Sequence, residues 1–490
     1  MFRVMTNRAL AWLFSPSDSL DRDQDRALRR ILRSASKTDI SQNYGFAGVR
    51  SIKEYQEKCP VHHYHDLKPY WQETERGKAD VVFHGTAKSF ALTSGTTGAQ
   101  KRVPLSDSFL ESYRGAQMRL LSVYLSRNRN SRVLDSKGLI ITGRSRITQT
   151  SAGIPCGMMS GIALETMSPI LRRKALPTNE TLNIADWDEK MIQMVREIAG
   201  QKVAYVFGIP SVLLPFLVFA RQTLTREQFQ YFAAHVEVCF VSGVDCEIYR
   251  EAIHSALGKK VDFFNLYAAS EGLMGYQISG TSRFRLFTER LFFEFLPFSE
   301  YQRGRYEPRQ TITDLSEDEE YVLLLTNGSG AFSYVIGDVL RCARAGRIPL
   351  LELAGRTTLM LNAVTEKTTV EAIEKVMGAI SRELGECPGE FVVTVKREGR
   401  RPNYVWVLQE CPTWRQRPAE WLGNRLDELL CEHNAHYASF IGSQLAPSEV
   451  LFVGSGFFQS WLSARGVEGG QQKVPRIVPE LSEVESYLKG

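Results

Sequence analysis

The clearest pattern of hydrophobic and polar positions lies in the middle of the chain, where short apolar runs alternate with helix-like segments. Residues 203–207 form one apolar run, and a glycine and a proline then lead into a longer apolar stretch at 212–219. A β-rich run recurs at 236–241, a helical pattern follows at 247–257, and a third β-rich run starts at 261 and ends at Tyr267. Because strands that alternate with helices form parallel sheets, we expect an α/β fold with a parallel, helix-covered sheet.

From Phe284 onward the pattern changes to apolar stretches separated by polar turns, which predicts antiparallel strands beside that sheet. A domain boundary is predicted between Gly355 and Arg356, giving a large N-terminal domain (1–355) and a small α/β C-terminal domain (356–490). The predicted antiparallel strands are 291–295, 321–326 and 332–336. In the small domain, helices are predicted at 369–384 and 418–434, and strands at 391–396, 404–409 and 450–453.

Length, composition and charge narrow the class of protein. A chain of 490 residues with 43% hydrophobic and 23% charged residues is long enough for more than one globular core. The net charge of +5 is mild, and the dense basic run 396–401 lies between two predicted strands, so we interpret that run as a hairpin turn. We therefore expect neither a nucleic-acid nor a membrane partner.

Cysteine spacing and the N-terminus indicate the compartment. The eight cysteines form no Cys-x-x-Cys pair and are too sparse for a disulfide framework. The apolar patch at 9–14 is too short for a signal peptide or a membrane span. A cytoplasmic protein is expected, and its oligomeric state is left open.

A segment rich in hydroxyl groups and glycine follows a strand-like run at 89–92. Glycines let consecutive backbone amides point at one anion, and hydroxyl groups add donors around phosphate oxygens. The glycine spacing is not that of a Walker A loop. The segment is either a phosphate-binding loop or an ordinary polar turn. It comprises Thr93, Ser94, Gly95, Thr96, Thr97, Gly98, Ala99, Gln100 and Lys101.

Two acidic residues follow β-rich runs further along the chain. Glu271 comes after Tyr267, Ala268 and Ser270, where a predicted parallel strand ends, and a carboxylate there can hold the hard cation that accompanies ATP. Asp338 directly follows Gly337 at the predicted end of a strand, and its two oxygens can accept hydrogen bonds from adjacent ribose hydroxyls. The alternatives are a capped turn with a solvated glutamate and an ordinary aspartate in a β-turn.

A lysine in the small domain completes the set. Lys473 follows two glycines and two glutamines, and a lysine on such a segment can stabilise negative charge that develops in a transition state. An exposed basic tail is the alternative. His62, His63 and His65 lie close together, but no set of carboxylates or cysteines with metal-ligand spacing completes them, so we predict structural or surface roles.

In order and approximate spacing, the four segments resemble the three ATP-binding motifs and the C-terminal lysine motif of the acyl acid amido synthetases. That family conjugates jasmonate and auxin to amino acids in plants and is a branch of the adenylate-forming enzymes. The resemblance extends over about residues 20 to 480 and includes the segments 59–70, 293–297 and 366–368. It implies a large N-terminal domain that binds ATP and acid, and a small C-terminal lid that rotates between two half-reactions.

The resemblance also implies cofactors, substrates and residue roles. ATP and Mg²⁺ are the implied cofactors, and a small carboxylic acid and an amine, plausibly an amino acid, are the implied substrates of an amide-forming ligase. Glu271 is the implied metal ligand and, with Lys101 and Lys473, one of three catalytic residues. The implied nucleotide site contains Thr93, Ser94, Gly95, Thr96, Thr97, Gly98, Ser242, Gly243, Tyr267, Ala268, Ser270, Tyr334, Gly337, Asp338 and Arg356.

Two positions depart from the related patterns. Gln100 stands where many relatives carry proline, and Thr357 and Thr358 follow Arg356 where the CoA-ligase branch usually has an aspartate. The second difference argues against a thioester-forming CoA ligase, which is the nearest alternative. A nucleotide-binding homologue without catalytic activity is the other, although Lys101, Glu271, Asp338 and Lys473 are all present.

Overall fold

The structure is a computed structural model, and the residue contacts within it divide the chain into two compact units. Unit 1 comprises Met1–Gly208, Ala220–Gly243 and Val261–Glu352, and unit 2 comprises Ile209–Phe219, Val244–Lys260 and Leu353–Gly490. The predicted domain boundary at 355/356 stays a prediction. The structure describes residues 2–15, 19–93, 101–243, 246–344, 347–357, 360–361, 363–364, 366, 368–397, 401–442, 444–464 and 473–488.

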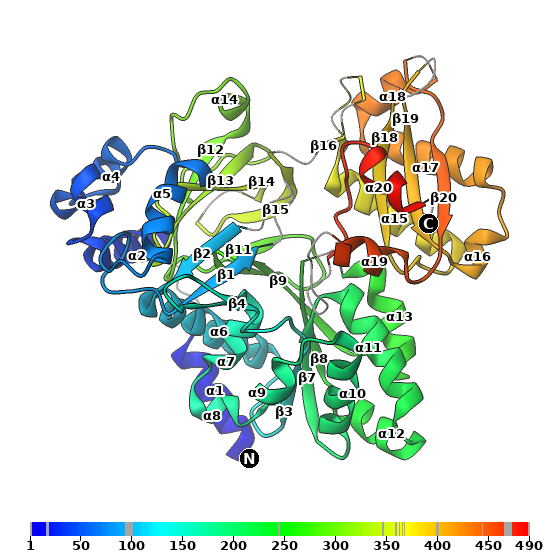
Figure 1. The fold of residues 1–490 in the computed structure, drawn as a ribbon, viewed down its shortest axis with the longest axis horizontal. Helices are drawn as coiled ribbons and strands as arrows, with labels where there is room; N and C mark the ends of the chain where they lie inside the picture. The colour runs from blue at the N-terminus through cyan, green and yellow to red at the C-terminus, as the bar shows by residue number, and fades with distance from the viewer. Residues whose placement is uncertain are drawn as a thin grey trace. The chain divides into compact units, whose positions relative to one another are not determined.

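An eleven-stranded sheet dominates unit 1 (Figure 1). Its strand order is β12-β13-β14-β15-β11-β10-β9-β8-β7-β3-β6. Neighbours from β6 to β9 are parallel, whereas β9 pairs antiparallel with β10 and β12 pairs antiparallel with β13, which confirms the predicted change of pattern. The strands are β3 (Lys137–Ile140), β6 (Ala175–Leu176), β7 (Val203–Gly208), β8 (Val238–Ser242), β9 (Asp262–Ala269), β10 (Gly272–Gln277), β11 (Phe284–Leu286), β12 (Phe292–Pro297), β13 (Glu320–Thr326), β14 (Tyr334–Arg344) and β15 (Leu350–Arg356).

A second sheet of four strands, in the order β2-β1-β5-β4, carries the hydroxyl-rich segment. Strands β1 and β2 pair antiparallel from Ser89↔Leu105 to Thr93↔Lys101. Residues 94–100 lie between them in the chain and outside the described residues. The strands are β1 (Ser89–Thr93), β2 (Lys101–Leu105), β4 (Thr148–Gln149) and β5 (Pro155–Met158).

Several helices of unit 1 begin at a residue whose side chain accepts a hydrogen bond from one of the first free backbone amides. The hydroxyl of Ser106, for example, accepts from the amide of Phe109 at 3.0 Å and starts α6 directly after β2. The helices are α1 (Phe2–Leu13), α2 (Leu20–Ala35), α3 (Asp39–Tyr44), η1 (Phe46–Gly48), α4 (Ile52–Lys58), α5 (Tyr64–Glu75), α6 (Asp107–Arg127), α7 (Met159–Glu165), α8 (Pro169–Arg172), α9 (Asn179–Leu182), α10 (Trp187–Ile198), α12 (Arg226–His235) and α14 (Phe298–Gln302).

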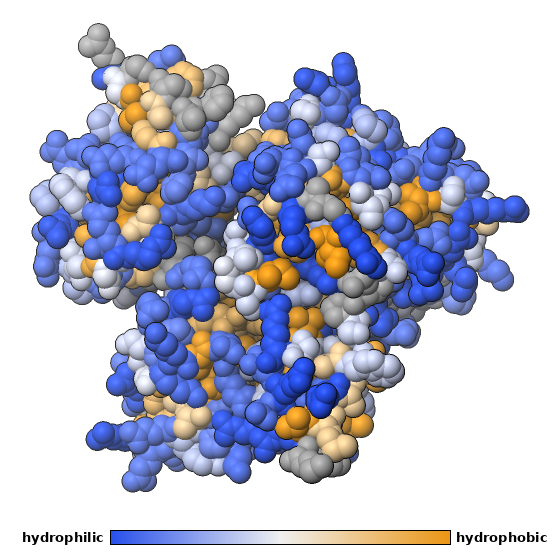
Figure 2. Space-filling view, turned by 180° about the vertical axis from the view of Figure 1, so that it is seen from behind, coloured by the Kyte–Doolittle hydropathy of each residue, from blue (hydrophilic) through white to orange (hydrophobic). Residues whose placement is uncertain are grey.

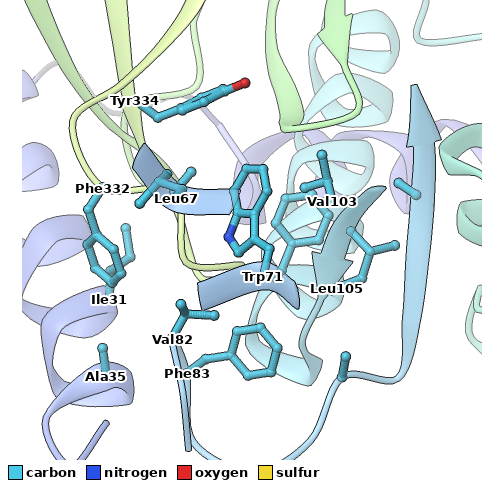
Figure 3. Close-up of a cluster of buried hydrophobic side chains, with 14 of the residues drawn as sticks. Ile31, Ala35, Leu67, Trp71, Val82, Phe83, Val103, Leu105, Phe332 and Tyr334 are labelled. Carbon is cyan, nitrogen blue, oxygen red and sulfur yellow. The ribbon is translucent and has the colours of Figure 1, made fainter. Parts of the chain in front are cut away.

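A hydrophobic cluster joins α5 to both sheets of unit 1. Trp71 is only 2% exposed and lies between Leu67 of its own helix, Val103 of β2 and Tyr334 of β14 (Figure 3). Aromatic side chains bury large apolar areas and therefore contribute much of such packing. The cluster fixes β2 against the start of β14, and both strands carry candidate nucleotide-binding residues.

Unit 2 contains a three-stranded sheet, and its helices α15 and α17 pack against each other. Strands β18 and β19 are antiparallel, and β20 is parallel to β19. Lys396 pairs with Asn403 where the two antiparallel strands are joined, as the predicted hairpin requires, while residues 398–400 of the basic run lie outside the described residues. The elements are α13 (Glu247–Leu257), β16 (Met360–Leu361), β17 (Thr368–Thr369), α15 (Val370–Leu384), β18 (Phe391–Lys396), β19 (Asn403–Gln409), α16 (Pro412–Arg415), α17 (Ala419–His433), α18 (Ala435–Phe440), β20 (Glu449–Val453), α19 (Phe457–Ala464) and α20 (Ser482–Leu488). Two elements, α11 (Pro210–Thr223) and β15, are divided between the units.

The surface seen in Figure 2 is mainly hydrophilic, with hydrophobic residues in small groups. Among the described residues, helices that combine the length and the apolar character needed to cross a bilayer are absent. Large apolar side chains are nevertheless exposed at the end of α1, where Trp12 and Leu13 lie. The apolar patch at 9–14 noted in the sequence thus contributes to an ordinary surface helix.

Candidate nucleotide site

The β1–β2 hairpin brings two predicted site residues opposite each other. Thr93 ends β1 and pairs with Lys101, the first residue of β2. Lys101 Nζ lies 4.8 Å from the centroid of the Tyr64 ring, a cation–π distance. Ser94, Gly95, Thr96, Thr97 and Gly98 lie outside the described residues, so their predicted contact with phosphate stays a prediction.

A row of aromatic rings leads from Lys101 to β14. The Tyr64 and Trp71 ring centroids are 5.7 Å apart, and those of Trp71 and Tyr334 are 5.8 Å apart. The backbone supports the same arrangement, because the His62 amide donates to the Ser333 carbonyl at 3.0 Å and the Val335 amide donates to the His62 carbonyl at 2.9 Å. The start of β14 is therefore held directly beside the segment that carries Tyr64.

His62 has a structural role in this arrangement. Its side chain is 2% exposed, with Nδ1 2.7 Å from the Phe332 carbonyl and Nε2 3.1 Å from the Tyr44 hydroxyl. Burial lowers the pKa of His62, which favours the neutral ring. In the part of the chain that the structure describes, no group of three or more His, Cys, Asp or Glu residues could hold a metal ion. The contacts of His62 agree with the structural role that is predicted for it.

Asp338 lies inside strand β14, so the predicted strand end at residue 336 is wrong. The strand continues to Arg344 because its later residues pair again with β13. Between the pairs Leu324↔Val335 and Val322↔Val339, the single residue Leu323 stands opposite three residues, which is a β-bulge. Gly337 within it has φ +93°, a conformation that favours glycine. A bulge redirects side chains locally, and the sequence pattern around this bulge predicted a strand end instead.

The Asp338 side chain meets the second predicted segment. It is 4% exposed, and the Tyr267 hydroxyl at the end of β9 donates a hydrogen bond to its Oδ2 at 2.7 Å. These residues are 71 positions apart in the chain. Strand pairing also places Ser242 of β8 beside Leu266 of β9, which brings the predicted adenine-site segments, Ser242–Gly243 and Tyr267–Ala268, to neighbouring strand ends.

Glu271 occupies the two-residue turn between β9 and β10, because Ala269 pairs with Gly272 across it. The backbone of this turn is tied to the β13–β14 connection: Asn327 Nδ2 donates to the Glu271 carbonyl at 2.8 Å. The Asn327 Oδ1 in turn accepts from the Ser329 amide at 2.8 Å and the Ala331 amide at 3.3 Å. The buried Asn327 therefore shapes the 327–331 turn and also holds the turn that carries Glu271.

The same connection is linked to the β1–β2 hairpin. The Ser106 hydroxyl, directly after β2, donates to the Gly328 carbonyl at 2.6 Å. Gly328 follows Asn327, so hydrogen bonds lead from the end of β2 through the 327–331 turn to Glu271. Unit 1 thus joins the candidate residues Lys101, Tyr334, Asp338, Tyr267 and Glu271 through continuous contacts. Two other predicted site residues, Arg356 and Lys473, belong to unit 2.

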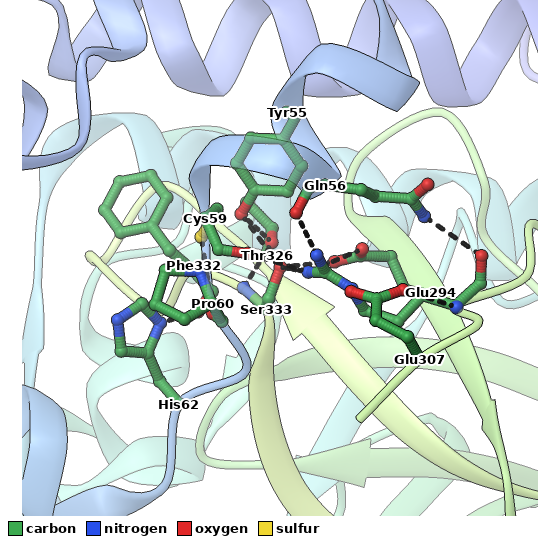
Figure 4. A network of polar contacts seen from close by, with 11 residues as sticks. Tyr55, Gln56, Cys59, Pro60, His62, Glu294, Glu307, Thr326, Phe332 and Ser333 are labelled. Atoms are coloured by element: carbon green, nitrogen blue, oxygen red, sulfur yellow. Dashed lines mark hydrogen bonds and ion pairs between the residues drawn. The ribbon is translucent and has the colours of Figure 1, made fainter. Parts of the chain in front are cut away.

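A buried ionic network supports the start of β14 and was not predicted. Glu294 of β12 is 0% exposed, and its Oε2 accepts from the Ser333 hydroxyl at 2.5 Å (Figure 4). Arg309 Nη1 lies 3.3 Å from Glu294 Oε1 and 2.9 Å from the Cys59 carbonyl. Burial raises the pKa of Glu294. A glutamate within the aromatic run 292–295 was the available sequence signal, because a carboxylate in an apolar strand requires a buried partner.

Comparison with known proteins agrees with this architecture. The chain matches the GH3 family N-terminal domain over residues 13–208, the GH3 family central domain over 284–356 and the GH3 family C-terminal domain over 371–482. It is 21% identical to the jasmonoyl–L-amino acid synthetase JAR4 of Nicotiana attenuata, over 93% of this chain and 90% of that one. It is 20% identical to the indole-3-acetic acid-amido synthetase GH3.3 of Arabidopsis thaliana, over 96% and 91%.

Solved structures share the fold at low identity. The GH3.15 acyl acid amido synthetase has a TM-score of 0.77 at 18% identity, covering 95% of this chain and 93% of its own. A 2-hydroxyisobutyryl-CoA ligase in complex with 2-HIB-AMP has a TM-score of 0.63 at 13% identity, covering 97% and 92%. The predicted fold class is thereby confirmed. Since three domain matches together cover most of its length, the chain belongs to the GH3 family, the acyl acid amido synthetases.

Proposed function

We propose that this enzyme adenylates a small carboxylic acid with ATP and transfers the acyl group to the amine of an amino acid. In the first step an oxygen of the acid attacks the α-phosphorus, the bond to the β-phosphate oxygen breaks and pyrophosphate leaves. In the second step the neutral amine attacks the carbonyl carbon, AMP leaves, and the nitrogen loses a proton to give the amide. The relatives' names, which pair jasmonate or indole-3-acetate with amino acids, support these substrate classes.

The observation that carries the assignment of the site is the hydrogen bond between Tyr267 and Asp338. It joins two of the segments that resemble ATP-binding motifs at the carboxyl ends of the parallel strands, where ligands of open α/β sheets bind. We assign Asp338 to the ribose hydroxyls, and Tyr267, Ala268, Ser242 and Gly243 to the adenine.

We assign the segment from Thr93 to Lys101 to the phosphates. Arg356 and Ser270 are assigned to the nucleotide site as well. Adenylation needs no protein nucleophile, because positioned donors and positive charge stabilise the transferring phosphate. Lys101 and Lys473 supply that charge in this proposal. Glu271 stands on a tight turn whose backbone is fixed by Asn327, and a single carboxylate together with phosphate oxygens suits Mg²⁺. When bound, Mg²⁺ would neutralise phosphate charge.

The test is a product analysis. Purified protein receives ATP, Mg²⁺, a panel of acids that includes jasmonate and indole-3-acetate, and a mixture of amino acids. We expect AMP, pyrophosphate and an amide detectable by mass spectrometry. ADP and phosphate as products would contradict adenylation. In a parallel reaction CoA replaces the amino acids, and a thioester there without an amide in the first reaction would identify a CoA ligase instead.

A site variant and a matched control variant show whether the measured activity comes from this protein and not from a contaminating enzyme. Asp338→Asn keeps the side-chain volume but removes the charge that binds two hydroxyls, so it should weaken ATP binding in pyrophosphate exchange. Asp314→Asn, an exposed aspartate in the loop before β13, should exchange at the wild-type rate. Equal activity of both variants would remove Asp338 from the site.

A further inference from the structure

The segment that carries Lys473 is attached to the sheet of unit 2. The Val393 amide of β18 donates to the Arg476 carbonyl at 2.9 Å, and the Val478 amide donates to the Val393 carbonyl at 3.0 Å. Ile477 forms a parallel bridge with Val393. Val474, Ile477 and Val478 are each 2% exposed, whereas Lys473 is exposed at the start of this segment. The backbone position of Lys473 therefore depends on how residues 474–478 are held.

Arg476 holds this segment by contacts to three different elements. Its side chain is 1% exposed. Nη1 donates to Glu390 Oε2 at 2.6 Å and to the Phe391 carbonyl at 3.2 Å, and Nη2 donates to the Tyr249 hydroxyl of α13 at 2.8 Å. The guanidinium also lies 4.1 Å from the centroid of the Phe391 ring, and Nε is 3.9 Å from Glu374 of α15. A planar fork of donors can make these contacts together, which a lysine cannot.

Stability alone gives a weak reason for such a cluster. Buried ion pairs often contribute no more to stability than apolar residues of similar volume, because desolvation opposes the Coulomb attraction. Unit 2 already has an apolar core around Trp461 and Val407. What the cluster adds is a defined geometry, and Arg476 is three residues from Lys473, a span of at most about 10 Å in an extended chain.

We propose that Arg476 is a positioning residue for Lys473 in the adenylation step. By fixing the segment 474–478 to β18 and α13, it sets the point from which the Lys473 ammonium acts. This inference rests on the proposed function, in which Lys473 stabilises charge during adenylation.

The test is a double-mutant cycle read by ATP–pyrophosphate exchange with the full-length protein. Lys473→Ala should slow exchange about 100-fold, as loss of one transition-state donor does in other enzymes. Arg476→Met should lower kcat about 10-fold or more, with the KM for ATP within about twofold, because a transition-state contact is lost and ground-state binding is not. In the Lys473→Ala background, Arg476→Met should cause no further loss, because the residue acts only through Lys473.

A milder variant of the same cluster and a control variant at another arginine complete the test. Tyr249→Phe removes one acceptor of the cluster and should lower kcat in the same direction by a smaller factor. Arg425→Met removes another ion-paired arginine of unit 2, bonded to Glu383 and Glu428, and should leave exchange unchanged. If Arg476→Met unfolds the protein, Tyr249→Phe and its cycle with Lys473→Ala provide the answer.

The outcomes distinguish the two proposals. A slow Lys473→Ala variant with a wild-type-like kcat in Arg476→Met and Tyr249→Phe would overturn the positioning role and leave the function of Lys473 intact. Equal losses from Arg476→Met with and without Lys473 would show a merely structural role. Wild-type exchange by Lys473→Ala would refute the role of Lys473 and the positioning role with it.

Discussion

Replacing Arg309 by methionine should strongly destabilise unit 1. The substitution leaves Glu294 as a buried carboxylate without its cation, and it removes donors to the Gln56 and Cys59 carbonyls and to the Ser333 hydroxyl. Breaking a buried ion pair by removing one partner costs about 3–5 kcal/mol. Each buried acceptor left without a donor costs about 1–3 kcal/mol. These contributions overlap, so we expect the free energy of unfolding to fall by at least about 3 kcal/mol.

The loss of stability caused by Arg309→Met should depend on pH in a defined direction. Burial already raises the pKa of Glu294, and loss of Arg309 should raise it further. An acid whose pKa is raised in the folded state destabilises the fold at pH values above that pKa, and protonation relieves the effect. The deficit of Arg309→Met relative to the wild type should therefore shrink as the pH is lowered from 8 toward 5.

Urea unfolding followed by circular dichroism at several pH values measures both effects. Glu294→Leu combined with Arg309→Met removes the lone charge and should be less destabilised than Arg309→Met alone by about 2 kcal/mol. Arg305→Met removes an exposed ion pair with Glu300 from the same loop and should change stability by less than about 1 kcal/mol. A deficit of Arg309→Met no larger than that of Arg305→Met, and independent of pH, would refute the reasoning.

Three further changes test the site and unit 2. Tyr267→Phe removes a hydrogen bond to the Asp338 carboxylate and should raise the KM for ATP in pyrophosphate exchange about tenfold, since such bonds contribute about 1.5–3 kcal/mol; an unchanged KM would contradict this. Asn327→Ala should slow exchange and raise the Mg²⁺ concentration needed for half-maximal rate, because the Glu271 turn loses its support; an identical Mg²⁺ titration would speak against it. Burial opposes ionisation of Glu366, but hydrogen bonds from two backbone amides and a tyrosine outweigh burial and lower the pKa of Glu366. Glu366→Gln should therefore reduce stability at pH 7, and this loss of stability should narrow as the pH falls below the usual glutamate range. A deficit that is the same at pH 7 and at a pH well below the usual glutamate range would show that the charge of Glu366 is irrelevant.

Much of the fold could be predicted from local pattern. The alternation at 203–267 indicated the parallel strands β7, β8 and β9, and the predicted helix 247–257 coincides with α13. The predicted strand 391–396 coincides with β18. Such predictions succeed because the periodicities of strands and helices are set by neighbours within a few residues. The motifs could be identified for the same reason, since each places glycine, hydroxyl or carboxylate groups close together in the chain.

What the local pattern could not determine is which distant groups meet. A bulge opposite Leu323 keeps Asp338 inside β14, and nothing in the residues around Gly337 distinguishes that bulge from a strand end. Glu294 accepts from Ser333, 39 positions away in the chain, Asn327 donates to Glu271, 56 positions away, and Arg476 donates to Tyr249, 227 positions away. A buried charge or amide must find its hydrogen bonds wherever the topology brings donors and acceptors together. The amino-acid sequence therefore determined the secondary-structure elements and the reactive side chains that they carry. The tertiary structure decided which polar groups are hydrogen-bonded to each other, because a polar group requires a partner within the protein only once folding has buried it.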